Sequence, residues 1–208
     1  MKSDYSLSEL GIISNQNKSS EIFEKIYPDI FNLQYAKPSE FIRLTWKKFE
    51  STDEHNNNLN GKIFEYLLAI ISIREKLLPL YLSAKVAFVP NVIYDIMFYT
   101  KEFGPICWSV KTSLRERYKQ ADLESIALKY VHRKSQSYLI TLNEQEAKNI
   151  KTKIKSGDVI GIDDVVVANS SDFDLLIEKM KKLDLHKSPK VEVIESNHII
   201  TTDVLDKI

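Results

Sequence analysis

The chain lacks several residue patterns that define whole classes of enzyme. Cysteine occurs once, at Cys107, which excludes an internal disulfide and a zinc site built from several cysteines. The four histidines, at positions 55, 132, 186 and 198, do not have the spacing of a metal site. The absence of a Gly-x-Ser-x-Gly sequence and of a glycine-rich phosphate loop argues against acyl hydrolases and nucleotide kinases. The acidic pair Asp163–Asp164 is not expected to bind metal, because adjacent strand residues face opposite ways; a turn or strand-end role is favoured.

Long apolar runs and a secretion signal are also missing. No apolar run approaches the length that spans a bilayer, and the N-terminal residues have no apolar core or small-residue cleavage site. The 208 residues can bury one sizeable core, and 43% hydrophobic with 28% charged residues is typical of globular proteins. We therefore expect one domain, residues 1–208, without a membrane segment, that remains in the cytoplasm.

The formal net charge of zero argues against a generally basic nucleic-acid-binding protein, but charge is unevenly distributed. Residues 111–134 contain seven Lys or Arg and three Asp or Glu, whereas residues 158–208 contain six and eleven. A basic middle segment fits local contact with phosphates. The alternative is an ordinary charged helix face in contact with solvent.

Apolar periodicity and turn residues predict an α/β protein. Residues 1–20 are polar and indicate a loose N-terminal arm or a late-forming turn. Helices are predicted at 21–33, 39–49, 62–77, 114–133, 143–155 and 173–183, and strands at 84–89, 92–100, 105–111, 137–141 and 158–168, with edge strands within 191–200. Strands placed among helices indicate a central mixed sheet flanked by helices on both faces.

Asp95 is the most unusual residue of the predicted strands, because an ionised group among apolar residues is costly unless a metal or partner accepts it. Magnesium takes oxygen ligands, and Asp95 with Glu124 would supply two carboxylates. Lys111 would direct its ammonium group at the attacking water or the phosphate in phosphodiester hydrolysis. Strand alternation places Ser109 and Lys111 on one face. Nucleases of the Asp…(Asp/Glu)-x-Lys type normally carry a carboxylate at the position of Ser109.

The helix that follows makes a resemblance specific. Lys111, then Arg115-Glu116-Arg117, then Glu124 resembles type II restriction endonucleases of the PD-(D/E)xK superfamily that read CCGG, CCNGG or CCWGG. In that group the second acidic ligand lies on the helix and a serine remains on the strand, as Glu124 and Ser109 do here. The resemblance also implies that the Arg-Glu-Arg cluster reads C:G pairs, since arginine donates to guanine and a carboxylate accepts from cytosine N4. The alternative is a solvent-facing charged run on a helix.

Further contacts with metal and DNA are predicted with less specific motifs. Similar nucleases often carry a glutamate at the start of the buried helix that positions a second metal through water, and Glu65 occupies that place. The alternative for Glu65 is a helix-start carboxylate that the helix dipole favours. Lys119, Arg133 and Lys134 are expected to contact DNA phosphates.

The resemblance, clearest over residues 60–133, implies a restriction-endonuclease-like fold with a catalytic core at about 60–170. It also implies magnesium-dependent hydrolysis of double-stranded DNA at a short, nearly palindromic site. A palindromic target predicts a homodimer, and protection of the host's own sites predicts a cognate DNA methyltransferase. Two alternatives stay open: a DNA-binding or partner-binding module that does not cleave, and a structure-directed repair or junction nuclease.

Overall fold

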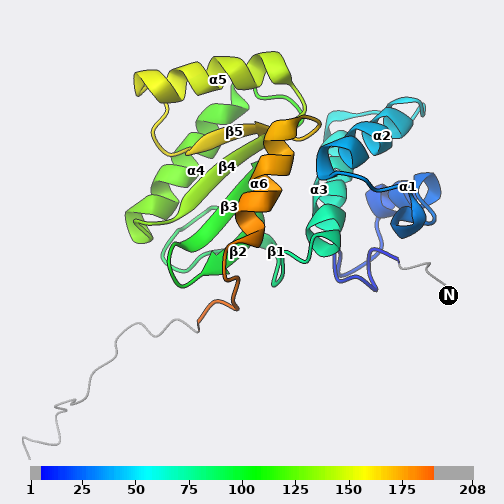
Figure 1. The fold of residues 1–208 in the computed structure, drawn as a ribbon, viewed down its shortest axis with the longest axis horizontal. Coiled ribbons are helices and arrows are strands. Elements are labelled where there is room, and N and C mark those ends of the chain that lie inside the picture. The colour runs from blue at the N-terminus through cyan, green and yellow to red at the C-terminus, as the bar shows by residue number, and fades with distance from the viewer. Residues whose placement is uncertain (1–5, 190–208) are drawn as a thin grey trace, which may run out of the picture.

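The computed structural model describes residues 6–189. Helices come first along the chain, three successive strands follow, and strands and helices alternate in the remaining part (Figure 1). The helices are α1 (Lys18–Ile26), α2 (Pro38–Glu50), α3 (Asn57–Arg74), α4 (Arg117–Val131), α5 (Glu144–Ser156) and α6 (Ser171–Lys181), with a short 3-10 helix, η1 (Ile30–Asn32). The strands are β1 (Tyr81–Ala84), β2 (Tyr94–Thr100), β3 (Gly104–Val110), β4 (Gln136–Thr141) and β5 (Asp164–Val167).

The five strands form one mixed sheet in the order β1-β2-β3-β4-β5. The first three are antiparallel neighbours, with Ile96 opposite Trp108 between β2 and β3. The last three are parallel, with Ser109 of β3 opposite Leu139 of β4. Parallel neighbours need a crossover, which α4 provides between β3 and β4 and α5 between β4 and β5. The predicted α/β architecture with a mixed sheet flanked by helices is confirmed.

Alternating strand residues divide the core between the two faces of the sheet. Tyr138 and Ile140 pack into the larger core with residues of α3 and α6, including Phe173. Leu139, between them on β4, packs with α4 and α5 on the opposite face, where Ala121 is also buried. Figure 1 shows the same division, with α3 and α6 on one side of the sheet and α4 and α5 on the other. The candidate site residues must therefore be assigned to a face before they can be grouped.

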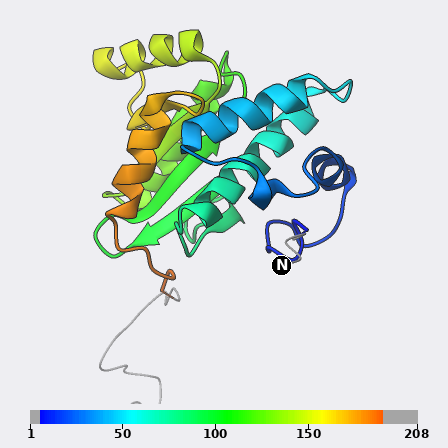
Figure 2. The same cartoon turned by 45° about the vertical axis from the view of Figure 1, so that its right-hand side comes forward.

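Residues 6–20 are packed against the domain; of the two forms that the polar composition predicted, a loose arm or a turn, the structure shows a turn at residues 7–11. Leu7 is 2% exposed and Ile12 is 8% exposed, and both belong to the larger core. Asn17 and Ser20 form a capping box that starts α1. Figure 2 shows this blue segment and α1 beside α3, away from the sheet. Two apolar side chains and a cap are sufficient to anchor an otherwise polar stretch.

One predicted strand is displaced and another is shorter than expected. The observed strand β1 (Tyr81–Ala84) shares only Ala84 with the strand expected at 84–89, and the loop after it contains left-handed backbone at Phe88 and Asn91, which a strand cannot accommodate. The strand expected at 158–168 is limited to Asp164–Val167, because the preceding residues form a loop that binds α4. The edge strands expected within 191–200 lie outside the described residues. Within 6–189, no helix has both the length and the apolar character that crossing a bilayer requires.

Candidate functional site

Asp95 and Lys111 meet at the end of the β2–β3 hairpin. Asp95 is at the start of β2 and Lys111 directly follows β3, so their antiparallel strands bring them to the same end of the sheet. Lys111 Nζ donates to Asp95 Oδ2 at 2.7 Å, and the backbone N–H of Val110 donates to the same oxygen at 2.7 Å. The side chain of Asp95 is 21% exposed and that of Lys111 is 18% exposed, so this ion pair is largely shielded from water.

A second ion pair lies on α3, within reach of Asp95. Lys62 Nζ donates to Glu65 Oε2 at 2.6 Å, one helical turn apart. Lys62, Glu65 and Asp95 all line one cavity of about 580 Å³. We call this cavity, with its lining residues, the Asp95 cavity. Two carboxylates from different elements therefore face a common space.

The remaining walls of the Asp95 cavity are both polar and apolar and come from distant parts of the chain. The N-terminal turn contributes residues 10–15, α3 contributes Tyr66 and Ile73, and Leu82 and Ser83 come from β1. The N-terminal turn is held by the carboxylate of Glu24, which accepts from the backbone N–H of Leu7 at 2.8 Å. The cavity thus has charged residues at one part and walls of mixed polarity around it.

Burial and neighbouring charge perturb both members of the α3 ion pair. Burial holds the pKa of Glu65 above its ordinary value, and the charge of Asp95 acts in the same direction, whereas Lys62 and Lys111 oppose it. Burial alone lowers the pKa of Lys62, but its hydrogen bond to Glu65 and the charges of Glu65 and Asp95 leave that pKa raised overall. These mutual effects mean that the four groups form one electrostatic cluster.

Ser109, Lys111 and Glu124 do not line the Asp95 cavity. Ser109 is 5% exposed and shares a face of β3 with Cys107, which packs with Leu128 of α4. Glu124 lies on α4, where its carboxylate accepts from the side chain of Gln120 at 2.7 Å. β3 ends at Val110, but the backbone N–H of Lys111 still donates to the carbonyl of Ile140 on β4 at 3.0 Å, so the pairing of the two strands continues to Lys111.

Glu124 is nevertheless close to the strand that carries Asp95. The hydroxyl of Tyr94, the residue before Asp95, donates to the backbone carbonyl of Glu124 at 3.0 Å. Burial raises the pKa of Cys107 to about 12, and the charges of Asp95 and Glu124 add to this effect. Within the part of the chain that the structure describes, no group of three or more His, Cys, Asp or Glu side chains forms a metal cluster.

The residues predicted to contact DNA divide between the two ends of α4. Arg115-Glu116-Arg117 and Lys119 are exposed at its start, the end of the sheet at which Asp95 and Lys111 lie, and Glu116 forms an ion pair with Lys119. Arg133 and Lys134 are exposed beyond its other end. The 15 residues of α4 separate the two groups by about 22 Å. Only the first group is close to the cavity end of the sheet.

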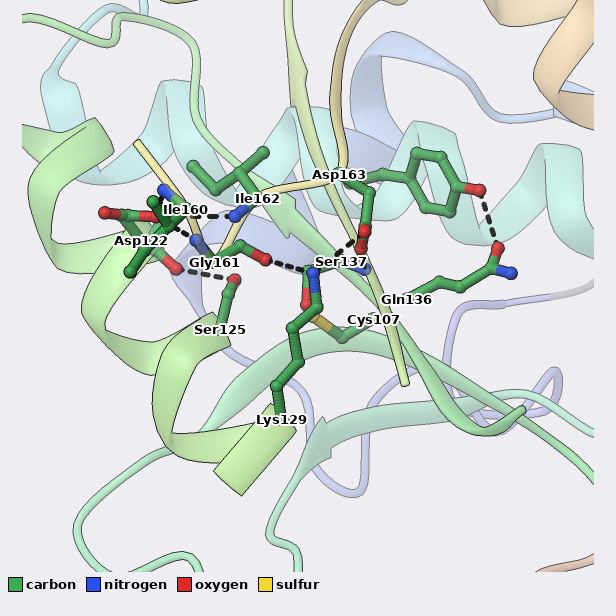
Figure 3. Close-up of polar contacts among 12 residues, drawn as sticks. Cys107, Asp122, Ser125, Lys129, Gln136, Ser137, Ile160, Gly161, Ile162 and Asp163 are labelled. Atoms are coloured by element: carbon green, nitrogen blue, oxygen red, sulfur yellow. Dashed lines mark hydrogen bonds and ion pairs between the residues drawn. The ribbon is translucent and has the colours of Figure 1, made fainter. Parts of the chain in front are cut away.

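The acidic pair Asp163–Asp164 has the strand-end role expected for it. Lys129 of α4 binds the carboxylate of Asp163 at 2.8 Å, and Asp164 begins β5. Asp122 accepts the backbone N–H of Gly161 at 2.6 Å, and Lys129 donates to the carbonyl of the same glycine at 2.6 Å. Figure 3 shows these contacts between α4 and the loop before β5. They hold the sheet and α4 together on the face opposite the Asp95 cavity.

The sequence predicted Asp95, Lys111 and Glu65 as site residues but did not single out Lys62 or the N-terminal wall. Lys62 precedes Glu65 by three residues on a predicted helix, a spacing that places both on one face, so this signal was present. No sequence pattern linked residues 10–15 to Asp95. Comparisons with protein-family models, with curated proteins and with solved structures give no match to this chain.

Proposed function

We propose that this chain is a type II restriction endonuclease, with a restriction-endonuclease-like fold, that hydrolyses double-stranded DNA with a divalent cation. The observation that carries the proposal is the meeting of two carboxylates and a lysine. Asp95 Oδ2 lies 2.7 Å from Lys111 Nζ, and Glu65 lines the same cavity as Asp95. Such a set supplies oxygen ligands for a hard cation and a positive charge for water or phosphate.

The donor set suits magnesium. This ion is usually held by one or two carboxylates, with water and substrate phosphate completing its six ligands. Asp95 and Glu65 provide two carboxylates that face one cavity. The bound ion would polarise a phosphoryl oxygen and lower the pKa of a water molecule. Glu124 is the alternative second ligand, since the resemblance assigns that role to it, and the cavity geometry favours Glu65.

Lys111 would act on the water or the phosphate. In the structure its ammonium group is held by Asp95 at 2.7 Å. A cation bound by Asp95 would compete for that carboxylate and would leave Lys111 available to a second negative group. Ser109, buried beneath the end of β3, would support the strand without touching the reacting atoms. Asp95 therefore has two successive partners, first Lys111 and then the cation.

DNA recognition is proposed for the exposed start of α4. Arg115 and Arg117 carry the donors that match guanine O6 and N7, and Glu116 carries the acceptor that matches cytosine N4. Lys119, and Arg133 with Lys134 at the far end of α4, would contact phosphates. A nearly palindromic target requires a two-fold symmetric homodimer. A DNA methyltransferase that protects the host's own sites is the expected functional partner, and we place both activities in the cytoplasm.

Cleavage of plasmid DNA in the presence of magnesium tests the proposal. We expect the unaltered protein to give discrete fragments, and Asp95→Asn and Lys111→Met to lower the rate about 100-fold or more. Glu65→Gln and Glu124→Gln decide the second ligand, since the variant that lacks the true ligand should lose cleavage to a similar extent. Glu144→Gln, an exposed carboxylate on α5, is the matched control and should retain the full rate.

Each alternative function gives a different result in this assay. A protein that binds duplex DNA but never cuts it, with any divalent cation, is a binding module and contradicts the proposal. A protein that cuts branched DNA and leaves linear duplexes intact is a structure-directed nuclease. Sequencing the fragment ends of a productive digest then gives the recognition site and the cleavage stagger.

A further inference from the structure

Lys62 lines the Asp95 cavity, whereas Lys111 does not. Its ammonium group donates to Glu65 Oε2 at 2.6 Å, and its side chain is 46% exposed while that of Glu65 is 20% exposed. The lysine is therefore accessible to solutes, and its carboxylate partner is the more enclosed of the two. Lys62 also experiences the charge of Asp95, across the cavity on β2.

This ion pair differs from other pairs on the helices of the protein. Glu40 with Arg43, and Glu116 with Lys119, have the same spacing of three residues, but all four side chains are between 42% and 80% exposed. Such surface pairs contribute little to stability. Lys62 and Glu65 instead line a cavity together with Asp95. Lys62 and Glu65 therefore face a cavity, which the two surface pairs do not.

The four charged side chains of the cluster are electrically balanced. Lys62 is paired with Glu65, and Lys111 is paired with Asp95, so two ammonium groups neutralise two carboxylates. A divalent cation held by Glu65 and Asp95 competes for the oxygens that now accept from the lysines. The formal charge of the cluster then rises from zero to plus two, and the two ammonium groups lose their partners. A site of this charge attracts a phosphate anion.

We propose that Lys62 is a phosphate-binding residue that a divalent cation releases from Glu65. This proposal rests on the nuclease function proposed above and adds to it a second cationic residue and an order of binding. Cation binding strengthens the binding of the DNA phosphate, and by thermodynamic linkage the phosphate strengthens cation binding. Lys62 and Lys111 approach the substrate from different elements, α3 and the end of β3.

Two binding measurements on the full chain test this role. In the first, calorimetric titration of the DNA-free protein with Ca²⁺ compares Lys62→Met with the unaltered chain. Removing the competing ammonium group should tighten Ca²⁺ binding about 3-fold, a typical gain for loss of a half-exposed competitor. Lys47→Met, which changes an exposed lysine of α2, is the matched control and should leave the affinity unchanged. Asp95→Asn should lose Ca²⁺ binding.

In the second measurement, fluorescence anisotropy gives the affinity of the protein for a labelled 30-base-pair duplex with and without Ca²⁺. Ca²⁺ should strengthen duplex binding by the unaltered chain about 10-fold, and this gain should fall below about 3-fold in Lys62→Met. Lys62→Arg retains the charge and should restore most of the gain. Lys47→Met should retain the full gain, because Lys47 does not line the Asp95 cavity. Thermal melting of each variant verifies folding.

The outcomes separate this proposal from the nuclease proposal. If the unaltered chain binds Ca²⁺ while Lys62→Met leaves both the Ca²⁺ affinity and the gain in duplex binding unchanged, Lys62 is only a helix-surface ion pair and the proposal is wrong. The nuclease proposal stands in that case. If the unaltered chain binds neither Ca²⁺ nor Mg²⁺, the nuclease proposal fails, and the role of Lys62 fails with it.

Discussion

One oxygen atom of Asp95 accepts two hydrogen bonds at the end of the β2–β3 hairpin. Its Oδ2 accepts from the backbone N–H of Val110 and from the ammonium group of Lys111, both at 2.7 Å. The pairing of β2 with β3 begins at Ile96 and Trp108, so the carboxylate joins the two strands beyond their ladder. A hydrogen bond to a charged group contributes about 1.5–3 kcal/mol to stability. Any variant at Asp95 therefore requires a stability measurement beside its activity.

Cys107 should be an inert thiol in the folded protein. It is fully buried in β3, and burial raises its pKa to about 12. At pH 8 the thiolate fraction is then about one in ten thousand, and the thiolate is the reactive form. We expect Ellman's reagent to react with the native protein at least about 100-fold more slowly than with the protein unfolded in guanidinium. Equal rates would contradict the burial of this residue.

The raised pKa of Cys107 makes the stability of the protein depend on pH. The folded-state pKa of Cys107 lies above its value in the unfolded chain, so the folded protein binds the thiol proton more tightly. The contribution to stability is complete below the unfolded pKa of about 8.5 and is lost as the pH rises toward 12. Urea denaturation above pH 9 should therefore show a smaller loss of stability in Cys107→Ala than in the unaltered chain.

Gly161 is required by close contact with α4. A Cβ at this position would lie 2.3 Å from the backbone carbonyl oxygen of Asp122, and backbone cannot move aside as a side chain can. We expect Gly161→Ala to lower the free energy of unfolding by about 1–3 kcal/mol. Gly61→Ala is the control, because a Cβ there meets nothing within 4 Å and α3 should gain about 1 kcal/mol. Urea denaturation measures both, and equal effects would exclude the contact as the cause.

The loop between β3 and α4 depends on one carboxylate from α5. Glu146 accepts the backbone N–H of Leu114 at 2.6 Å and the hydroxyl of Ser113 at 3.4 Å. The next residue, Arg115, has a φ of +24°, a conformation that a side-chain-bearing residue adopts only when its surroundings hold it. Glu146 thus positions the predicted DNA-reading cluster without belonging to it.

Loss of this anchor should loosen the loop selectively. Glu146→Ala is expected to lower the free energy of unfolding by about 1–3 kcal/mol more than Glu144→Ala. Both residues lie in the first turn of α5, so both variants lose the same favourable charge at the helix start. Hydrogen exchange of the Leu114 amide should accelerate in Glu146→Ala only. Similar exchange rates in the two variants would show that the loop is held by other contacts.

At the scale of the whole molecule, the N-terminal segment has two packing roles. It contributes to the core beside α3, and it forms a wall of the Asp95 cavity. Leu7 is 2% exposed, whereas Leu44 on α2 is 47% exposed. We expect Leu7→Ala to cost about 2–4 kcal/mol of unfolding free energy, and Leu44→Ala less than about 0.5 kcal/mol. Thermal and urea denaturation measure the difference. A small effect at Leu7 would mean that the segment detaches before the domain unfolds.

In the whole molecule, the two faces of the sheet differ in what they contain. Lys129, Asp163 and Asp122 hold α4 and the loop before β5 on one face (Figure 3). The other face, under α3 and the N-terminal segment, contains the cavity with its paired charges. The candidate site therefore lies where the N-terminal segment and α3 meet the start of β2.

Local patterns in the sequence were sufficient for most elements. The predicted helix at 114–133 is observed as α4, and the predicted strand at 105–111 is observed as β3, because periodicity and the absence of Gly and Pro act within a few residues. The strand predicted at 84–89 failed, since left-handed backbone at Phe88 and Asn91 interrupts an apolar run that has strand character. The packing of Leu7 and Ile12 into the core was not predicted, because the residues around them before α1 are mostly polar.

The sequence by itself singled out the candidate site residues: Asp95 isolated among apolar neighbours, Lys111 at the end of the next strand, and Glu65 on a buried helix. Only the tertiary structure decided which of them share a space. It places Glu65 and Lys62 at the cavity of Asp95, brings Lys111 to Asp95 from outside the lining, and leaves Ser109 and Glu124 outside it as well. The physical reason is that spacing along a chain sets the face of one helix or strand, whereas neighbours across faces depend on how distant segments pack.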